Sequence, residues 1–367
     1  MNGEWSHYNG DVGGTKYSRL EQINTTNVHE LELVWRFRVP DFDPSKRSVI
    51  QFNPLMVNDL LYLATVGQKI LAVEPATGNK IWEFDPHAGS EIRGTVRGVL
   101  YWESGDDMRI YFGAANGFYA LNVMTGELIE GFGEGGRLDL TQNLDHDGIS
   151  RRFDARVPGV IYKDILILSG SVGEGPTQAN PGHIRGFDVR TGERKWIFHT
   201  VPHPGEFGYE TWSPDSYKYV GGTNAWGGLT LDEERGMVFL GTGSATYDHW
   251  GGNRIGDNLF ANCVLALYAE TGERIWHFQA VHHDLWDYDL PTPPTLITLV
   301  KDGEEIDAVA QPSKMGHLFV LDRETGEPIF GVEERPVPST EVPGDVSSPT
   351  QPFPIKPLPY TDQDFTL

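Results

Sequence analysis

The chain has 367 residues, enough to bury a large core, and its 43 glycines, 24 prolines and 10 tryptophans favour turns and short strands over long helices. A formal net charge of −23 would repel nucleic acid phosphates and anionic membranes, so neither is expected as a partner of this surface. No stretch approaches the ~20 apolar residues of a membrane span, and the first ten residues are not expected to be a secretory leader. The single cysteine, Cys263, excludes an intramolecular disulfide and is predicted to be a buried, unreactive thiol.

A similar phrase recurs five times along the chain. Each copy has an alternating apolar strand, a turn that ends in Thr-Gly, and a second short strand that usually carries an aromatic residue. The glycine supplies the positive φ that a tight hairpin needs, and the aromatic residue fits a packing role between repeats. The copies read AVEPATGNKIWEF from Ala72, ALNVMTGELIEGF from Ala120, GFDVRTGERKWIF from Gly186, ALYAETGERIWHF from Ala266 and VLDRETGEPIFGV from Val320.

The strands before these phrases alternate apolar and polar residues, as in LLYLATV (60–66) and GMVFLGTG (236–243). Asn116-Gly117 is a strong hairpin signal. Sheets that repeat at such intervals predict an all-β fold, a β-propeller in which each sheet is one blade. Five phrases and the similar ELVWRF (32–37) before them indicate five or six blades, and the uneven gaps between them predict long loops on one face.

Two other motifs suggest metal sites but favour simpler interpretations. His282 and His283 open the acid-rich and aromatic HHDLWDYDLPTPP, yet adjacent histidines of a strand point to opposite faces and rarely ligate one ion together. The acids and glycine of NLDHDGISRRFD, from Asn143 to Asp154, have a spacing like that of an EF-hand loop. Because no helical pattern flanks this stretch, we expect a solvated loop.

The opening EWSHYNGDVGGTKYSRLEQINTTNVHEL resembles the N-terminal signature of the quinoprotein dehydrogenases, which carry pyrroloquinoline quinone (PQQ) and a divalent metal. The likeness continues through VRGVLYW, SGSVGEGP, DHWGGNR, HHDLWDYDLPTPPTL, PSKMGHLFVLDRETG and SSPTQPFP. It is closest to the branch of glucose and polyol dehydrogenases, since Glu91 and Ile92 stand where methanol dehydrogenases carry adjacent cysteines. The resemblance implies a periplasmic, eight-bladed propeller. We expect residues 1–367 to be a single propeller domain that is incomplete at its C-terminal end.

The resemblance also implies the residues of a cofactor site. Asp287 matches the base that takes the proton of the substrate hydroxyl, and Lys314 matches the lysine that hydrogen-bonds the quinone oxygens. Trp226 matches the floor under the PQQ ring, and Asn224, in the same NAWGG run, is expected to contact the cofactor. Arg97 matches the arginine that pairs with a PQQ carboxylate, a partner that suits the guanidinium fork.

A metal ligand set follows from the same resemblance. Glu174 matches the acidic ligand of the family, and Asp287 is expected to ligate the metal as well as accept the proton. Ser244 stands where alcohol dehydrogenases carry asparagine, so either its hydroxyl or that of nearby Thr246 would supply a neutral oxygen. Asp289 adds a further acid. An oxygen-only set fits Ca²⁺, with Mg²⁺ or a lanthanide as alternatives.

Two functions of different classes fit the repeats. The first is a PQQ-dependent dehydrogenase that transfers hydride from an alcohol, sugar or polyol to PQQ while the metal polarises the quinone, and passes electrons to a quinone or a cytochrome c. For the full-length protein the resemblance also allows a peripheral or anchored membrane association. The second is a non-catalytic propeller of the same repeats that serves as a scaffold. A scaffold has no reason to keep five residues at family spacing, which favours the enzyme: Arg97, Glu174, Trp226, Asp287 and Lys314.

Overall fold

Short antiparallel strands make up nearly all of the regular structure in this computed structural model, which describes residues 5–146, 152–175 and 178–363. The helices in these ranges are three single 3₁₀ turns, η1 (Val28–Glu30), η2 (Tyr209–Thr211) and η3 (Ser216–Lys218). Within the described ranges, no helix has the length and apolar character needed to cross a membrane.

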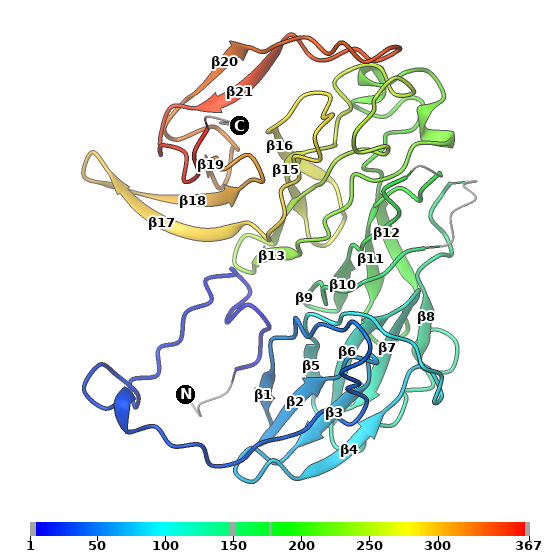
Figure 1. Ribbon diagram of the computed structural model, residues 1–367, viewed down its shortest axis with the longest axis vertical. Helices are drawn as coiled ribbons and strands as arrows, with labels where there is room; N and C mark the ends of the chain where they lie inside the picture. The colour runs from blue at the N-terminus through cyan, green and yellow to red at the C-terminus, as the bar shows by residue number, and fades with distance from the viewer. Residues whose placement is uncertain (1–4, 147–151, 176–177, 364–367) are drawn as a thin grey trace.

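Six antiparallel sheets follow one another around an arc, from blue to red in chain order (Figure 1). Within each sheet, strands that are consecutive in sequence are hydrogen-bonded neighbours. The sheets are β1 (Leu55–Val57), β2 (Leu60–Ala64), β3 (Ile70–Val73), β4 (Lys80–Phe84); β5 (Leu100–Ser104), β6 (Asp107–Ala114), β7 (Gly117–Asn122), β8 (Arg137–Asp139); β9 (Val160–Tyr162), β10 (Ile165–Leu168), β11 (Ile184–Asp188), β12 (Arg194–Phe198); β13 (Leu229–Asp232), β14 (Met237–Gly241), β15 (Cys263–Tyr268), β16 (Arg274–Gln279); β17 (Thr295–Lys301), β18 (Glu304–Pro312), β19 (Leu318–Asp322); and β20 (Val332–Pro336), β21 (Thr350–Pro354).

The core of the protein lies between neighbouring sheets. The first strands of successive sheets, β5, β9, β13 and β17, contact one another, as the inner strands of propeller blades do. Four apolar clusters fill the spaces between the first five sheets in turn. Cys263 lies fully buried in one of them, and burial raises the pKa of its thiol, as predicted for a packing residue. The all-β propeller expectation is confirmed.

An aromatic residue from ELVWRF and one from each of the first four repeats pack on the Thr-Gly turn of the next sheet. All five turn glycines have positive φ, between 71° and 76°. At four of them a side chain would collide with an indole ring, as a Cβ on Gly126 would meet Trp82 at 2.5 Å, whereas at Gly192 the Phe132 ring would lie 3.4 Å away. The indole N–H of Trp82 also donates to the carbonyl of Val123, at 3.0 Å. The pairs are Trp35 on Gly78, Trp82 on Gly126, Phe132 on Gly192, Trp196 on Gly272 and Trp276 on Gly326.

The count of six sheets agrees with the prediction, but the sixth sheet is not the one expected. Residues 32–37 form no strand, although Trp35 stacks on its turn glycine like the others, because no strand in the described ranges lies beside this segment to exchange backbone hydrogen bonds. The sixth sheet is the hairpin β20–β21. In the repeats from Ala120 and Val320, the expected second strand shrinks to one bridge; in the latter, Pro328 has no N–H to extend a ladder.

The predicted hairpin near Asn116 exists but turns one residue earlier. Ala114 pairs with Gly117 across β6 and β7, so the central turn residues are Ala115 and Asn116, and Ala115 takes the positive φ of 49°. Gly117 therefore begins β7 instead of supplying the turn. A close approach explains why this position favours glycine, since a Cβ there would meet the Arg137 side chain at 2.6 Å.

Candidate functional site

All eight predicted site residues line one cleft of about 250 Å³. In an up-and-down sheet, the loop between the second and third strands and the connection to the next sheet lie at the same end. The site residues occupy these positions in several sheets, so the loops converge on one face as predicted. They lie in the connections β4–β5 (Arg97), β10–β11 (Glu174), β12–β13 (Asn224, Trp226), β14–β15 (Ser244), β16–β17 (Asp287, Asp289) and β18–β19 (Lys314).

Lys314 joins the two aspartates of the cleft. Its ammonium lies 2.7 Å from Asp287 Oδ2 and 2.8 Å from Asp289 Oδ2. Burial lowers the pKa of Lys314, but the hydrogen bonds to both carboxylates outweigh burial and raise it. Burial raises the pKa of Asp287, an effect that Lys314 partly offsets and that the nearby charge of Asp289 reinforces. Asp287 also has a φ of 57°, uncommon for a residue other than glycine, so its backbone is held in a left-handed conformation at the cleft.

Two cations lie near the Trp226 ring, and hydrogen bonds hold the loop that carries it. The guanidinium of Arg97 lies 5.2 Å from the centre of its ring, and the Lys314 ammonium lies 5.6 Å from it. Arg97 also donates to the Trp226 carbonyl at 3.3 Å and to Gln51 Oε1 at 3.2 Å. Asn224 donates through Nδ2 to the Gly170 carbonyl at 2.9 Å, which ties the Trp226 loop to the neighbouring sheet.

Asp289 has three donors. One oxygen accepts from the backbone N–H of Ser244 at 2.7 Å, and the other accepts from the Trp226 indole N–H at 2.9 Å and from Lys314. Only 7% of Asp289 is exposed. The Ser244 hydroxyl donates to the Asp284 carboxylate. Both residues therefore have structural partners, and their predicted role as metal ligands remains a prediction.

Asp248 is a site residue that the sequence interpretation missed. It lines the cleft, is 9% exposed, and burial followed by the charges of Asp287, Asp289 and Glu174 raises its pKa to about 8. It lies in the DHWGGNR motif, so the family likeness was visible, but an isolated aspartate gives no signal of burial. The sequence also missed two arginines of the cleft, Arg152 and Arg156, which flank Asp154 at 3.0 and 3.4 Å.

The two motifs that suggested metal sites differ in outcome: the two histidines are separated as expected, whereas the described part of NLDHDGISRRFD is not a plain solvated loop, since Leu144 and Phe153 are buried in the core. His282 contacts Glu334 at 3.1 Å whereas His283 contacts the Gly256 carbonyl at 2.6 Å, so the two rings have different surroundings, although the segment is a loop and not a strand. Residues 147–151 of the EF-hand-like stretch lie outside the described residues. Its described part includes Asp154, which pairs with arginines of the cleft.

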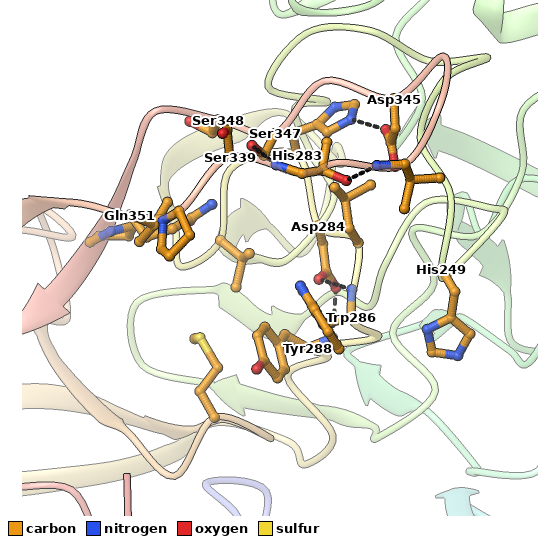
Figure 2. A pocket seen from close by; sticks show the side chains of 18 of the residues that line it. His249, His283, Asp284, Trp286, Tyr288, Ser339, Asp345, Ser347, Ser348 and Gln351 are labelled. Carbon is orange, nitrogen blue, oxygen red and sulfur yellow. Dashed lines mark hydrogen bonds and ion pairs between the residues drawn. The ribbon is translucent and has the colours of Figure 1, made fainter. Parts of the chain in front are cut away.

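A larger cavity of about 870 Å³ lies on the other side of the segment that carries Asp287. Trp286 and Tyr288 line this cavity, whereas Asp287 and Asp289 line the smaller cleft. In Figure 2, the carboxylate of Asp284 accepts the backbone N–H groups of Trp286 at 2.9 Å and Tyr288 at 2.6 Å. These hydrogen bonds fix the backbone conformation in which Asp287 and Asp289 point to one side and Trp286 and Tyr288 point to the other.

Comparison with known proteins identifies the family. The PQQ family described as "Glucose/ethanol/alcohol dehydrogenase, beta-propeller domain" matches residues 5–366. The chain belongs to this family. It is 35% identical over 372 residues to the quinoprotein glucose dehydrogenase of Escherichia coli (strain K12), covering 95% of this chain and 46% of that protein. It is 32% identical over 370 residues to the glycerol dehydrogenase large subunit of Gluconobacter oxydans (strain 621H), covering 96% and 49%.

Solved structures agree on the fold. The quinohemoprotein alcohol dehydrogenase of Comamonas testosteroni superposes with a TM-score of 0.74 at 25% identity, covering 96% of this chain and 52% of that one. A europium-containing methanol dehydrogenase gives 0.73 at 22% identity, covering 97% and 62%. The chain therefore spans about half the length of the curated relatives it matches.

Proposed function

We propose that the protein takes part in the PQQ-dependent oxidation of an alcohol, sugar or polyol. The observation that carries the proposal is the convergence of Arg97, Glu174, Trp226, Asp287 and Lys314 on one cleft, although they come from five different inter-strand connections. The relatives support the same chemistry, since they include dehydrogenases of glucose and glycerol.

The residues of the cleft fit a flat tricarboxylate. Three arginines line it, and the hydrogen bonds that the structure gives to Arg97 go to neutral oxygens. Arg97 therefore keeps a charge that a PQQ carboxylate would neutralise through a bidentate contact. Arg152 and Arg156 share one acid, Asp154, so the pair carries one positive charge in excess. Trp226 provides the aromatic platform.

The cleft also fits a hard cation. Glu174, Asp248 and Asp287 bring three carboxylates to one place, and the raised pKa of Asp248 reflects their mutual repulsion as well as burial. Oxygen ligands of this kind suit Ca²⁺ or Mg²⁺, or a lanthanide of higher charge. The hydroxyl of Thr246, the alternative neutral ligand to Ser244, accepts a hydrogen bond from the backbone N–H of Gly221 at 3.0 Å.

When bound, PQQ supplies an ortho-quinone that accepts hydride from the alcohol carbon, and the metal polarises its carbonyl. We propose that the chain supplies the base. Asp287 takes the hydroxyl proton, and Lys314, 2.7 Å away, keeps enough of it ionised for this role despite the burial that raises its pKa. Asp289 holds the Lys314 ammonium and the Trp226 ring in register. We further propose a periplasmic location and transfer of electrons to a quinone or cytochrome.

The direct test is titration of the purified chain with PQQ in excess Ca²⁺, followed by quenching of tryptophan fluorescence. Saturable binding, at least tenfold weaker in Trp226→Ala, is expected because that ring is the proposed floor. A folded chain without PQQ binding, or equal dissociation constants for both proteins, contradicts the proposal. In the full-length enzyme, Asp287→Asn should abolish turnover of an alcohol with an artificial dye while PQQ still binds. Unchanged turnover would exclude Asp287 as the base.

A further inference from the structure

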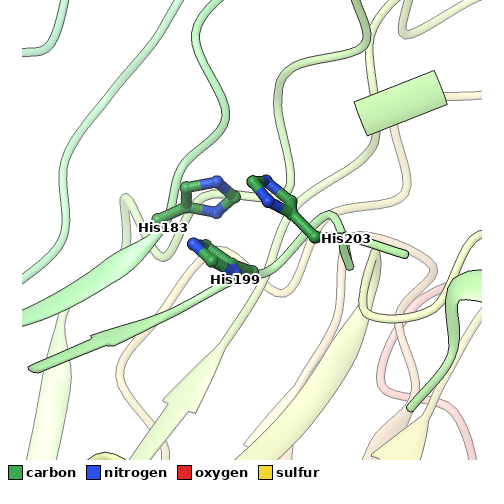
Figure 3. Close-up of side chains that lie close together, drawn as sticks. All are labelled: His183, His199 and His203. Atoms are coloured by element: carbon green, nitrogen blue, oxygen red, sulfur yellow. The ribbon is translucent and has the colours of Figure 1, made fainter. Parts of the chain in front are cut away.

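Three histidines lie close together beside β11 and β12, the last two strands of the third sheet (Figure 3). His183 comes directly before β11, and His199 comes directly after β12. The register pairs Ile184 with Phe198, so the two histidines lie side by side at the end of this hairpin. His203 follows on the loop after β12. One ring nitrogen of each residue lies within 4.8 Å of those of the other two.

His183 directs an unused nitrogen at this cluster. The residue is completely buried, and its Nε2 has no hydrogen-bond partner among the described residues. An unpaired polar atom in such a place costs free energy unless a ligand satisfies it. Burial lowers the pKa of His183 and of His203 and so favours the neutral ring, which is the form that binds metals.

Two carboxylates complete the surroundings. Glu206 Oε1 lies 2.8 Å from His199 Nδ1, a bond in which the ring donates. The other ring nitrogen, His199 Nε2, lies 3.4 Å from Asp145 Oδ2. A ring nitrogen and a carboxylate oxygen at that separation require a proton or a cation between them. A carboxylate on the far nitrogen is also the usual support for a histidine that ligates zinc.

We propose that His183, His199 and His203, with Asp145, form a site for a divalent transition-metal ion such as Zn²⁺. Imidazole nitrogens suit Zn²⁺, Co²⁺ and Ni²⁺, whereas the cleft of Asp287 offers only oxygen and suits a hard ion. A tetrahedral ion with bonds of about 2.0 Å places its ligand atoms about 3.3 Å apart. The ligand nitrogens, now up to 4.8 Å apart, must therefore come closer together, and His203 must leave its parallel stack on His199.

Metal binding also sets the proton on His183. Without the ion, the backbone N–H of Thr200 donates to Nδ1 at 3.0 Å, which places the ring hydrogen on Nε2. Ligation through Nε2 moves the hydrogen to Nδ1, so the Thr200 backbone N–H must give up its bond to the ring, and the Thr200 hydroxyl at 3.4 Å becomes the acceptor within reach. The Thr200 hydroxyl can then donate a hydrogen bond to the Thr223 hydroxyl, 2.6 Å away. The Thr223 hydroxyl donates in turn to the Gly222 carbonyl at 2.7 Å.

The site would fasten a loop that also carries cofactor-site residues. The chain from His199 to β13 contains Asn224 and Trp226, and Thr223 directly precedes Asn224. An ion held by His183 on one strand and by His203 on this loop would fix the start of the loop, and the Thr200–Thr223 contact would transmit that restraint to Asn224. The ion is thus structural, distinct from the reaction.

The test measures Zn²⁺ binding to the PQQ-free chain by calorimetry, with excess Ca²⁺ present to fill the oxygen-lined cleft. We expect one Zn²⁺ per chain. His203→Gln, a change on a partly exposed loop, should weaken it roughly 100-fold or more, and Glu206→Gln roughly 10- to 100-fold. His29→Gln, at a side chain that is 71% exposed, is the matched control and should bind like the parent.

Two spectroscopic readouts separate a built site from adventitious binding. Co²⁺ should give the intense visible bands of a tetrahedral ion, lost in His203→Gln, and Zn²⁺ should slow hydrogen exchange in peptides covering residues 199–226. Thr200→Val should weaken binding while the chain remains folded by circular dichroism. Absence of Zn²⁺ binding, or equal affinity in the parent and His203→Gln, overturns the proposal. Because PQQ is absent throughout, these results are independent of the proposed enzymatic function.

Discussion

Asp289 offers the sharpest test of what the acids in the cleft do. Its carboxylate accepts from Ser244 N–H, the Trp226 indole and the Lys314 ammonium, so we interpret it as the residue that holds the site together. If it acted only as a metal ligand, the metal-free chain would gain stability on its removal, because negative charges would repel one another less. If it holds the site together, Asp289→Asn will destabilise the metal-free chain.

The magnitude follows from counting donors. An asparagine has one oxygen, and its amide group donates, so either orientation turns an N–H towards at least one of the three donors. Hydrogen bonds to charged groups contribute about 1.5–3 kcal/mol, and an unsatisfied buried donor costs about 1–3 kcal/mol. Relief of the repulsion with Asp287 offsets part of this. We expect Asp289→Asn to lower the free energy of unfolding by about 2–4 kcal/mol, measured by urea denaturation with a chelator present.

Asp248→Asn is the matched control, since above pH 8 it removes the same charge from the same cleft. A pKa near 8, raised chiefly by burial, means that Asp248 is protonated in the folded chain while the unfolded chain is ionised, so parent stability falls as pH rises from about 4 to 8. The variant should equal the parent below pH 4 and exceed it by roughly 2–4 kcal/mol above pH 8, less than the upper limit of about 6 that the whole pKa shift would give. Stabilisation by Asp289→Asn, or loss of stability by Asp248→Asn at pH 9, would refute the interpretation.

Two further predictions concern the blades and the base. Gly126→Ala should lower the free energy of unfolding, measured by urea denaturation, by at least about 2 kcal/mol more than Gly105→Ala does. Both glycines have positive φ, but only a Cβ at Gly126 meets the Trp82 ring, at 2.5 Å. Equal losses would mean that the ring moves freely. Lys314→Met removes the cation that restrains the pKa of Asp287, so the acidic limb of the pH–rate profile of the cofactor-loaded, full-length enzyme should move to higher pH. An unmoved limb would argue against Asp287 as the titrating base.

The repeats predicted the fold well because their signal is local. A Thr-Gly turn and the aromatic residue after it define a hairpin without knowledge of its neighbours, and three of the five phrases fold as strand, turn and strand. The exceptions depend on tertiary surroundings. The segment around Trp35 has strand-like residues but no neighbouring strand within the described ranges. In the repeat from Ala120, β8 pairs with β7 in place of the expected segment, and Phe132 takes the position on the turn glycine that tryptophan takes elsewhere.

The site was predictable only where a motif names the residue. Trp226 and Lys314 lie in motifs of the family, and the structure brings them within 5.6 Å. The surroundings of Asp248 could not be predicted, because the acids beside it, Glu174, Asp287 and Asp289, come from other inter-strand connections. The histidine cluster had no sequence signal either, since His183 and His199 are 16 positions apart and meet only through the β11–β12 register.

The geometry of the cleft is therefore a property of how the sheets pack together. Arg97 and Lys314 lie in connections of the first and fifth sheets, yet both approach the Trp226 ring. Their separation is set by the apolar clusters between successive sheets and by the aromatic rings that pack on turn glycines at the outer edges. A small change in the angle between two sheets would displace one wall of the cleft relative to the other. Because bound cofactor positions tolerate little displacement, packing changes far from the cleft should weaken PQQ binding before they unfold the chain.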